Sequence, residues 1–322
     1  MKKTYREIKQ IASKTIETEA YAITKLIDYI DDGFAKCVEA VLLSKGRVII
    51  TGIGKSAVIG SKIVATLNST GTPAIFMHAA DAVHGDLGII QKDDIILCIS
   101  NSGNTPEIKI LIPYIKLSGN LLIGLVGNRK SYLAQQADLI IDATVEKEAC
   151  PNNLAPTSST TAQLVMGDAL AVSLLECRGF TTEDYAKYHP GGVLGKKLFL
   201  RVSDLYLQNE KPQVQASADV TTAIIEISSK LLGATAVLDR EKLIGMITDG
   251  DLRRMMQSGK PLNELMAKDI MTTNPKTVGP NSLVAHALDI MRSKNITQLL
   301  VEDKGQYLGV IHLHDILKEG IL

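Results

Sequence analysis

The sequence predicts an α/β protein in two parts: a doubly wound five-stranded parallel sheet, followed by two copies of a small α/β unit. Five short β-branched runs occur before residue 145, and helix-like segments separate most of them. Apolar strands that alternate with helices are typical of a parallel sheet covered on both faces. Beyond about residue 200 one pattern of apolar and charged residues occurs twice, which indicates a duplicated unit.

The first part begins with helical spacing. Apolar residues recur at helical intervals over 4–30, and a second helix is expected over 33–44. The expected strands follow at Val48–Ile50, Ala74–Met77, Ile95–Ile99, Leu121–Val126 and Leu139–Ile141. Residues 78–91, between the second and third strands, are expected to form an irregular loop. A long helix is expected over 158–178, with Ser158 near its N-cap.

The second part contains an internal repeat. LIGMITDGDLRR at 243–254 matches YLGVIHLHDILK at 307–318, which places Asp251 and Asp315 at equivalent positions 64 residues apart. A duplicated pair of this kind is expected to pack about a pseudo-two-fold axis. The predicted organisation is an N-terminal helical segment at 1–34, a sheet domain at 35–182, a linker at 183–202, and α/β units at 203–264 and 270–322.

Composition excludes several classes of protein. Net charge is zero, with 35 basic and 35 acidic residues, so no overall field favours nucleic acid or an anionic membrane. The chain has no Trp and 4 Phe, which argues against a stacking surface for single-stranded nucleic acid. It shows no signal peptide and no apolar stretch of membrane-spanning length. The cysteines form no CxxC pattern and are expected to be reduced core or site-lining residues; they are Cys37, Cys98, Cys150 and Cys177.

Glycine and hydroxyl residues follow expected strands or open expected helices in three segments: TGIGKS at 51–56, SNSGNTPE at 100–107 and APTSSTT at 155–161. Backbone N–H groups and the helix dipole favour an anion at such positions. Each turn taken alone could be an ordinary helix cap. The two Ser/Thr-rich turns in one sheet are harder to explain as caps and indicate a phosphate site. Its candidate residues are Lys55, Ser100, Ser102, Thr105, Ser158, Ser159 and Thr160.

The segments do not fit a P-loop, a dinucleotide-binding motif or a catalytic zinc site. A P-loop requires glycine at position 49, where Ile49 stands, so that interpretation fails. A dinucleotide site would need an acidic residue at the end of the second strand, where Met77 and His78 stand instead. His78 and His84 lack the spacing of a helical zinc pair and a third ligand nearby, which disfavours a catalytic metal.

Together with HGDLG at 84–88, EACP at 148–151 and HPGGVLG at 189–195, these segments closely resemble the arabinose-5-phosphate isomerase family. In that family a sugar isomerase (SIS) domain of flavodoxin-like fold precedes two CBS modules. The resemblance runs from about residue 35 to the C-terminus. It implies that the chain is a homotetramer that needs no organic cofactor. Composition and the lack of a signal or membrane segment predict a cytoplasmic protein that binds no nucleic acid or membrane. The implied reaction interconverts D-ribulose 5-phosphate and D-arabinose 5-phosphate, the first step of Kdo synthesis for lipopolysaccharide or capsule.

The resemblance also implies roles for particular residues. The family's catalytically relevant positions fall on Lys55, Glu107, Glu148 and His189. Further substrate contacts fall on Gly71, Thr72, His78 and His84, and His78 matches a position that takes inhibitory zinc. Asp81 stands where many relatives have Glu. In TDGD, Thr248 and Asp251 are typical of a nucleotide or sugar-nucleotide site, whereas His312 replaces the threonine in the second copy.

An isomerisation through an enediolate needs a base, a polarised oxygen and a held phosphate. The expected base at carbon is Glu148, with Glu107 as the alternative. His189 is expected to serve ring opening and hydroxyl protons, and Lys55 the developing oxyanion or the phosphate. Two other functions use the same scaffold: a sugar-phosphate sensor, and an aminosugar-phosphate isomerase or deaminase.

Overall fold

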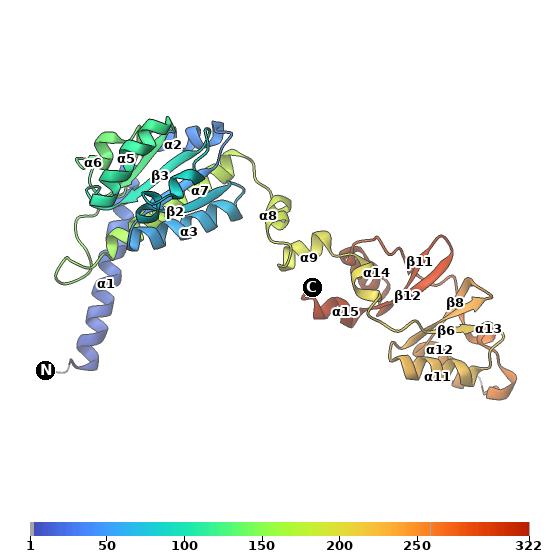
Figure 1. The fold of residues 1–322 in the computed structure, drawn as a ribbon. Helices are drawn as coiled ribbons and strands as arrows, with labels where there is room; N and C mark the ends of the chain where they lie inside the picture. The colour runs from blue at the N-terminus through green and yellow to red at the C-terminus, as the bar shows by residue number, and fades with distance from the viewer. Residues whose placement is uncertain (1–2, 258, 322) are drawn as a thin grey trace. The chain divides into compact units, whose positions relative to one another are not determined.

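The computed structural model describes residues 3–257 and 259–321. The chain divides into two compact units, Met1–Tyr188 and His189–Leu322. Each unit is described by itself, with the helices and strands labelled in Figure 1.

The first unit contains the predicted parallel sheet. Its five strands are all parallel and follow the order β2-β1-β3-β4-β5, which confirms the doubly wound class. Each strand lies within one or two residues of its expected position, because short runs of β-branched residues mark buried strands well. The strands are β1 (Val48–Gly52), β2 (Ala74–His78), β3 (Ile95–Ser100), β4 (Leu122–Val126) and β5 (Leu139–Asp142).

Helices cover both faces of this sheet (Figure 1). Ile50 points into a core that contains apolar residues of α2, α3 and α7, whereas its neighbour Ile49 points into a second core with residues of α5 and α6. Successive strand residues therefore serve opposite layers, as the alternation of side chains requires. The helices are α2 (Asp32–Leu43), α3 (Lys55–Ser69), α4 (Ala79–Ala82), α5 (Pro106–Ser118), α6 (Tyr132–Gln136), α7 (Ser158–Cys177) and α8 (Thr182–Tyr188).

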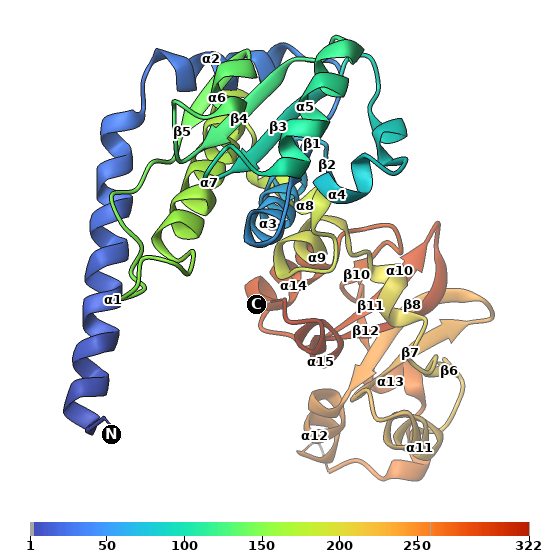
Figure 2. The ribbon, with the colours of Figure 1, turned by 60° about the vertical axis from the view of Figure 1, so that its left-hand side comes forward.

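The N-terminal helix α1 (Tyr5–Lys25) runs beyond the sheet domain, as Figure 2 shows. A capping box between Thr4 and Glu7 starts it. The C-terminal half lies against α7, where Thr161 donates a hydrogen bond to Glu19 at 3.1 Å. The isoleucines of the first half face solvent on the single chain, at 49 to 70% exposure. Helical spacing therefore located the helix but not the burial of this face.

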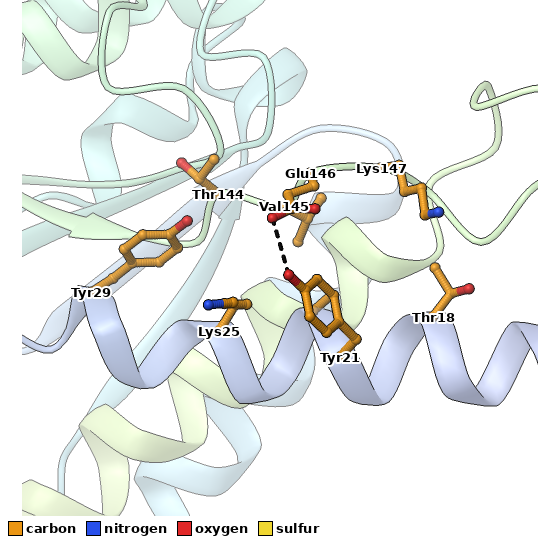
Figure 3. Close-up of a pocket in the computed structure, with 9 residues that line it drawn as sticks. Thr18, Tyr21, Lys25, Tyr29, Thr144, Val145, Glu146 and Lys147 are labelled. Atoms are coloured by element: carbon orange, nitrogen blue, oxygen red, sulfur yellow. Dashed lines mark hydrogen bonds between the residues drawn. The ribbon is translucent and has the colours of Figure 1, made fainter.

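A small pocket lies between α1 and the segment that follows β5 (Figure 3). The empty space in and around it, open solvent included, is about 320 Å³. Tyr21 and Glu146 both line it, and the Tyr21 hydroxyl donates a hydrogen bond to Glu146 at 3.3 Å. This contact ties the exposed helix to the loop that leads to Glu148.

The second unit contains a seven-stranded mixed sheet in the order β10-β11-β12-β8-β7-β6, with β9 paired to β8. The two halves have mirrored strand orders and meet where β12 pairs antiparallel with β8, as expected for a duplicated unit. The strands are β6 (Gln213–Gln215), β7 (Ala234–Asp239), β8 (Lys242–Thr248), β9 (Thr272–Thr273), β10 (Thr277–Val278), β11 (Gln298–Asp303) and β12 (Gln306–His312).

The segment 183–202, for which the sequence suggested a linker, is largely helical. Nearly all of α8, which ends the first unit, and all of α9, which begins the second, lie within it. The helices of the second unit are α9 (Val193–Phe199), α10 (Val202–Tyr206), α11 (Val220–Lys230), α12 (Asp249–Gln257), α13 (Ala267–Ile270), α14 (Val284–Lys294) and α15 (Leu313–Lys318).

The burial of the four cysteines agrees only in part with the expectation that they are core or site-lining residues. Cys37 and Cys98 are buried and Cys150 is half-buried, but Cys177 is exposed, so it is not a core residue. It lies in the last turn of α7, where the helix emerges from the core. Within the described residues, no helix is both long enough and apolar enough to cross a bilayer.

Candidate active site

An open pocket of about 690 Å³ lies at the carboxyl edge of the parallel sheet. Three chain segments line it: the β1–α3 turn, the β3–α5 turn and the first turns of α7. The carboxyl ends of parallel strands meet at one edge, which brings these distant segments together. Six predicted residues line this pocket, namely Lys55, Ser100, Ser102, Thr105, Ser159 and Thr160.

The β1–α3 turn delivers a cation to the positive end of a helix. Gly54 adopts φ +61° at the N-cap of α3, in the left-handed region that favours glycine. Lys55 and Ser56 then open the helix, and its first turn contains no acidic residue. Because a lysine at a helix N-terminus adds to the dipole's positive charge, this end of the pocket favours an anion.

The β3–α5 turn is held tightly in shape. The Ser100 hydroxyl, 4% exposed, accepts a hydrogen bond from Gly103 N–H at 3.0 Å and lies 3.4 Å from the Thr105 hydroxyl. Gly103 has φ +63° and packs against Ser131. Pro106 occupies the first position of α5, where its lack of an N–H costs no helical hydrogen bond. The turn therefore presents fixed hydroxyl groups to the pocket.

At the start of α7, the Glu148 carboxylate acts as a helix cap. One oxygen, Oε2, accepts hydrogen bonds from Thr157 N–H at 2.8 Å, Ser159 N–H at 3.1 Å and the Thr157 hydroxyl at 3.1 Å. Ser159 also lines the pocket, so Glu148 is connected to the pocket wall through one residue. The Ser158 hydroxyl is fully buried and does not line the pocket.

These contacts set the charge of Glu148. Burial acts to raise the pKa of its carboxyl group, but hydrogen bonds from Ser159 and Thr157 outweigh burial and hold the pKa below its usual value. Glu148 is therefore a carboxylate at neutral pH. Its second oxygen is not engaged by these three donors.

Glu107, in the first turn of α5, differs from Glu148 in its environment. Its Oε2 atom is buried and has no hydrogen-bond partner within the described part of the chain. Across the sheet, His78 ends β2 beside Gly52 of β1. Its Nδ1 lies 3.7 Å from an Asp81 oxygen. His84 is exposed in the following loop. Among described residues no cluster of three His, Cys, Asp or Glu side chains could hold a metal ion.

Gly71 and Thr72 lie away from this pocket. They precede β2 and so belong to the amino edge of the sheet, opposite the pocket. There Arg178 donates a hydrogen bond to the Thr72 hydroxyl, and Phe180 packs over Gly71. His189 begins the second unit, so the pocket described here consists of first-unit residues alone.

Three polar lining residues, Ser56, Asn101 and Gln163, were not among the sequence candidates. The Ser56 hydroxyl donates to Oε1 of Gln163 at 3.1 Å. Gln163 is 1% exposed and lies one turn beyond Ser159 on α7. The available signal was the interval of four residues between Ser159 and Gln163, which places both side chains on one helix face. Thr157, the N-cap that binds the Glu148 carboxylate, was also missed.

In the second unit, the expected regulatory residues Thr248 and Asp251 bind one another. Asp251 is 5% exposed and accepts from Thr248 N–H at 2.9 Å, the Thr248 hydroxyl at 2.6 Å and the Thr272 hydroxyl at 3.0 Å. The equivalent Asp315 accepts from Asn209 at 2.6 Å. Asn209 lies before β6 and Thr272 lies before β10, so the aspartate of each module is contacted by a residue from the start of the other module. The internal symmetry therefore extends to side chains.

Comparisons with known proteins agree with this architecture. The SIS domain family model matches residues 41–173, and the CBS domain model matches residues 202–258 and 267–321. The chain is 48% identical to a protein of Pseudomonas aeruginosa named arabinose 5-phosphate isomerase KdsD, over 97% of this chain and 96% of that one. It is 47% identical to the protein of the same name from Yersinia pestis, over 98% and 97%.

A solved structure also resembles the first part of the chain. An Escherichia coli CFT073 protein in complex with arabinose 5-phosphate superposes with a TM-score of 0.57 at 39% identity. The match covers 58% of this chain and 100% of that one. The relatives therefore span nearly the whole sequence, and the similar ligand-bound structure spans more than half of it.

Proposed function

The chain belongs to the arabinose 5-phosphate isomerase KdsD family, and from this premise we propose that it interconverts D-arabinose 5-phosphate and D-ribulose 5-phosphate. Near-full-length similarity to two proteins of that name carries the proposal. The pocket adds chemical support, because a lysine, several hydroxyl groups and three helix N-termini suit a phosphate ester. The product would enter Kdo synthesis, for lipopolysaccharide or capsule.

The reaction transfers one proton between neighbouring carbons. A base removes the proton from C2 of the open-chain aldose, and the electron pair moves into a C1–C2 double bond while O1 gains negative charge. Transfer of the proton from O2 to O1 and return of a proton to C1 give the ketose. No net oxidation occurs, so we propose that no organic cofactor is required. A positioned base contributes roughly 10²–10⁴-fold to such a step.

Glu148 is our proposed base at carbon. Its carboxylate is ionised, and the three donors fix Oε2 so that Oε1 has a defined orientation. The same hydrogen bonds weaken it as a base, which keeps Glu107 as the alternative. The buried Oε2 of Glu107 has no donor in the described part of the chain, and a substrate hydroxyl would supply one.

We assign Lys55 to the developing oxyanion or the phosphate, and His189 to ring opening and hydroxyl protons. Gly71 and Thr72 lie at the opposite edge of the sheet from the pocket of their own subunit. We propose that the chain is a homotetramer and that Gly71 and Thr72 contact substrate in the pocket of another subunit. His78 is proposed as a substrate contact and as the residue that binds inhibitory zinc, with His84 as a further substrate contact.

Three further parts of the proposal concern the chain as a whole. We propose that it is cytoplasmic and acts without nucleic acid or membrane. We also propose that the CBS pair takes a nucleotide or sugar nucleotide near Thr248 and Asp251. Such a ligand would have to replace hydrogen bonds that Asp251 already accepts.

The decisive experiment is incubation of the purified full-length protein with D-ribulose 5-phosphate in D₂O. Proton NMR is expected to show D-arabinose 5-phosphate with deuterium at C2. A sugar-phosphate sensor would bind the substrate without converting it. An aminosugar isomerase would convert glucosamine 6-phosphate and leave ribulose 5-phosphate unchanged, so either result would contradict the proposal.

The identity of the base requires paired variants. Glu148→Gln is expected to abolish deuterium exchange at carbon while sugar-phosphate binding, measured by calorimetry, persists. Glu107→Gln is the matched control. Normal exchange in Glu148→Gln together with loss in Glu107→Gln would transfer the role to Glu107.

A further inference from the structure

Gln163 has an arrangement that its place in the hydrophobic helix α7 does not explain. Ser56 donates a hydrogen bond to its Oε1 atom at 3.1 Å, which fixes the orientation of the amide. The Nε2 atom at the other side of the amide is buried and has no hydrogen-bond partner in the described ranges. Gln163 nevertheless lines the pocket. A buried amide N–H without an acceptor is destabilising, so such a group indicates a missing partner.

The pocket is the open space next to this amide. Gln163 lies one helical turn beyond Ser159, so both side chains lie on the face of α7 that lines the pocket. Ser56, which orients the amide, belongs to the α3 turn that carries Lys55. The amide thus lies where the first turns of two helices meet.

The pocket's composition selects the chemistry of that partner. Among the described residues, its lining contains one lysine and six Ser or Thr residues but no Asp or Glu. Both candidate bases, Glu107 and Glu148, lie outside the lining. The lining therefore suits the phosphate end of the ester, and the reacting carbons are expected on the side nearer a carboxylate.

We propose that Gln163 binds substrate directly, by donating its Nε2–H to a phosphate oxygen while Ser56 holds the amide in the donating orientation. The proposal rests on the proposed function for the identity of the phosphate ester. It adds a phosphate-binding amide to the lysine and hydroxyl groups found from the sequence.

Two substitutions at position 163 separate donation from packing. Gln163→Leu removes the donor, and Gln163→Glu preserves size while placing an anion against the phosphate. We expect the inhibition constant of inorganic phosphate and the KM for D-arabinose 5-phosphate to rise about tenfold in Gln163→Leu, and about 100-fold in Gln163→Glu. The kcat should change little, because the amide contacts the phosphate equally in substrate and transition state.

A matched control tests whether the effect comes only from loosening α3 against α7. Lys62 and Asp168 form an ion pair between the same two helices, outside the pocket. Asp168→Asn breaks that pair and should leave KM and the phosphate constant within about twofold. If Asp168→Asn reproduces the effect of Gln163→Leu, the role is structural and the proposal is overturned.

The remaining outcomes also decide the question. Ser56→Ala leaves Gln163 in place but releases its amide, and a several-fold rise in the phosphate constant is expected even if the Gln163 variants fold poorly. Phosphate binding as tight in Gln163→Glu as in the unaltered protein would refute the proposal. Calorimetry with inorganic phosphate measures binding without turnover. A failure of the proposed isomerase activity would therefore be seen separately: the unaltered protein would bind phosphate but convert no arabinose 5-phosphate.

Discussion

Replacing Gly103 by alanine tests whether the geometry of the β3–α5 turn determines phosphate binding. An added Cβ would overlap the Ser131 hydroxyl oxygen and lie 2.5 Å from the Ser131 Cβ. Gly103 also has φ +63°, and its N–H binds the Ser100 hydroxyl. The left-handed backbone costs a non-glycine residue about 1–2 kcal/mol, and overpacking adds about 1–3 kcal/mol. We therefore expect Gly103→Ala to lower the free energy of unfolding by about 2–5 kcal/mol.

Gly119 is the matched control at the other end of α5. It has φ +76° but no atom within 4 Å of an added Cβ, so Gly119→Ala should cost only the backbone contribution of about 1–2 kcal/mol. Urea unfolding followed by circular dichroism measures both variants, and phosphate inhibition measures the site. Gly103→Ala should weaken phosphate binding, whereas Gly119→Ala should not. Equal stability losses in the two variants, with phosphate binding unchanged in both, would show the reasoning to be wrong.

Three other properties can be tested directly. Thr157→Val removes the hydroxyl donor to Glu148, so the pKa of the carboxyl group should rise toward its usual value. The acidic limb of the kcat/KM profile should then move to higher pH, and an unmoved limb would indicate another base. Burial opposes ionisation of Asp94, but hydrogen bonds from Arg47 outweigh burial and lower its pKa. Its contribution to stability is thus present above about pH 4, the usual value in the unfolded chain, and is lost as pH falls through the lowered folded value. Asp94→Asn should cost about 3 kcal/mol in urea unfolding at neutral pH and less in acid; equal costs at both pH values would contradict this. Hydrogen bonds from backbone N–H groups, chiefly that of Ala155, lower the pKa of the Cys150 thiol. Iodoacetamide should therefore alkylate Cys150 before the other cysteines, as measured by mass spectrometry. Faster labelling of another cysteine would contradict this.

The sequence predicted the sheet well because its strands are short, β-branched and buried on both faces. Ile49 and Ile50 illustrate this: both are fully buried, in different cores, so the strand shows a continuous apolar run. The exposure of the isoleucines of α1 could not be predicted in the same way. Helical periodicity predicts an apolar face on α1. It does not predict whether other parts of the same chain cover that face.

The candidate site was predictable to the extent that it lies in turns after strands. Ser100 and Ser159 come together because parallel strands present their carboxyl ends at one edge. The capping of α7 by Glu148 and the bond from Ser56 to Gln163 could not be foreseen, since they depend on how loops and helices 9 and 107 residues apart in sequence fold together. Local sequence contains no signal for such contacts.

A pocket lined without carboxylates in the described part of the chain has a consequence for selectivity. Its hydroxyl, amide and ammonium groups suit any monophosphate ester, so with the phosphate bound there the pocket gives little discrimination between the sugars attached to it. Discrimination between pentose and hexose phosphates must therefore be made beyond the pocket, by groups that meet the carbon chain. Substitutions that retune sugar preference should accordingly map to those outer groups, while changes inside the pocket should alter affinity for all phosphorylated sugars alike.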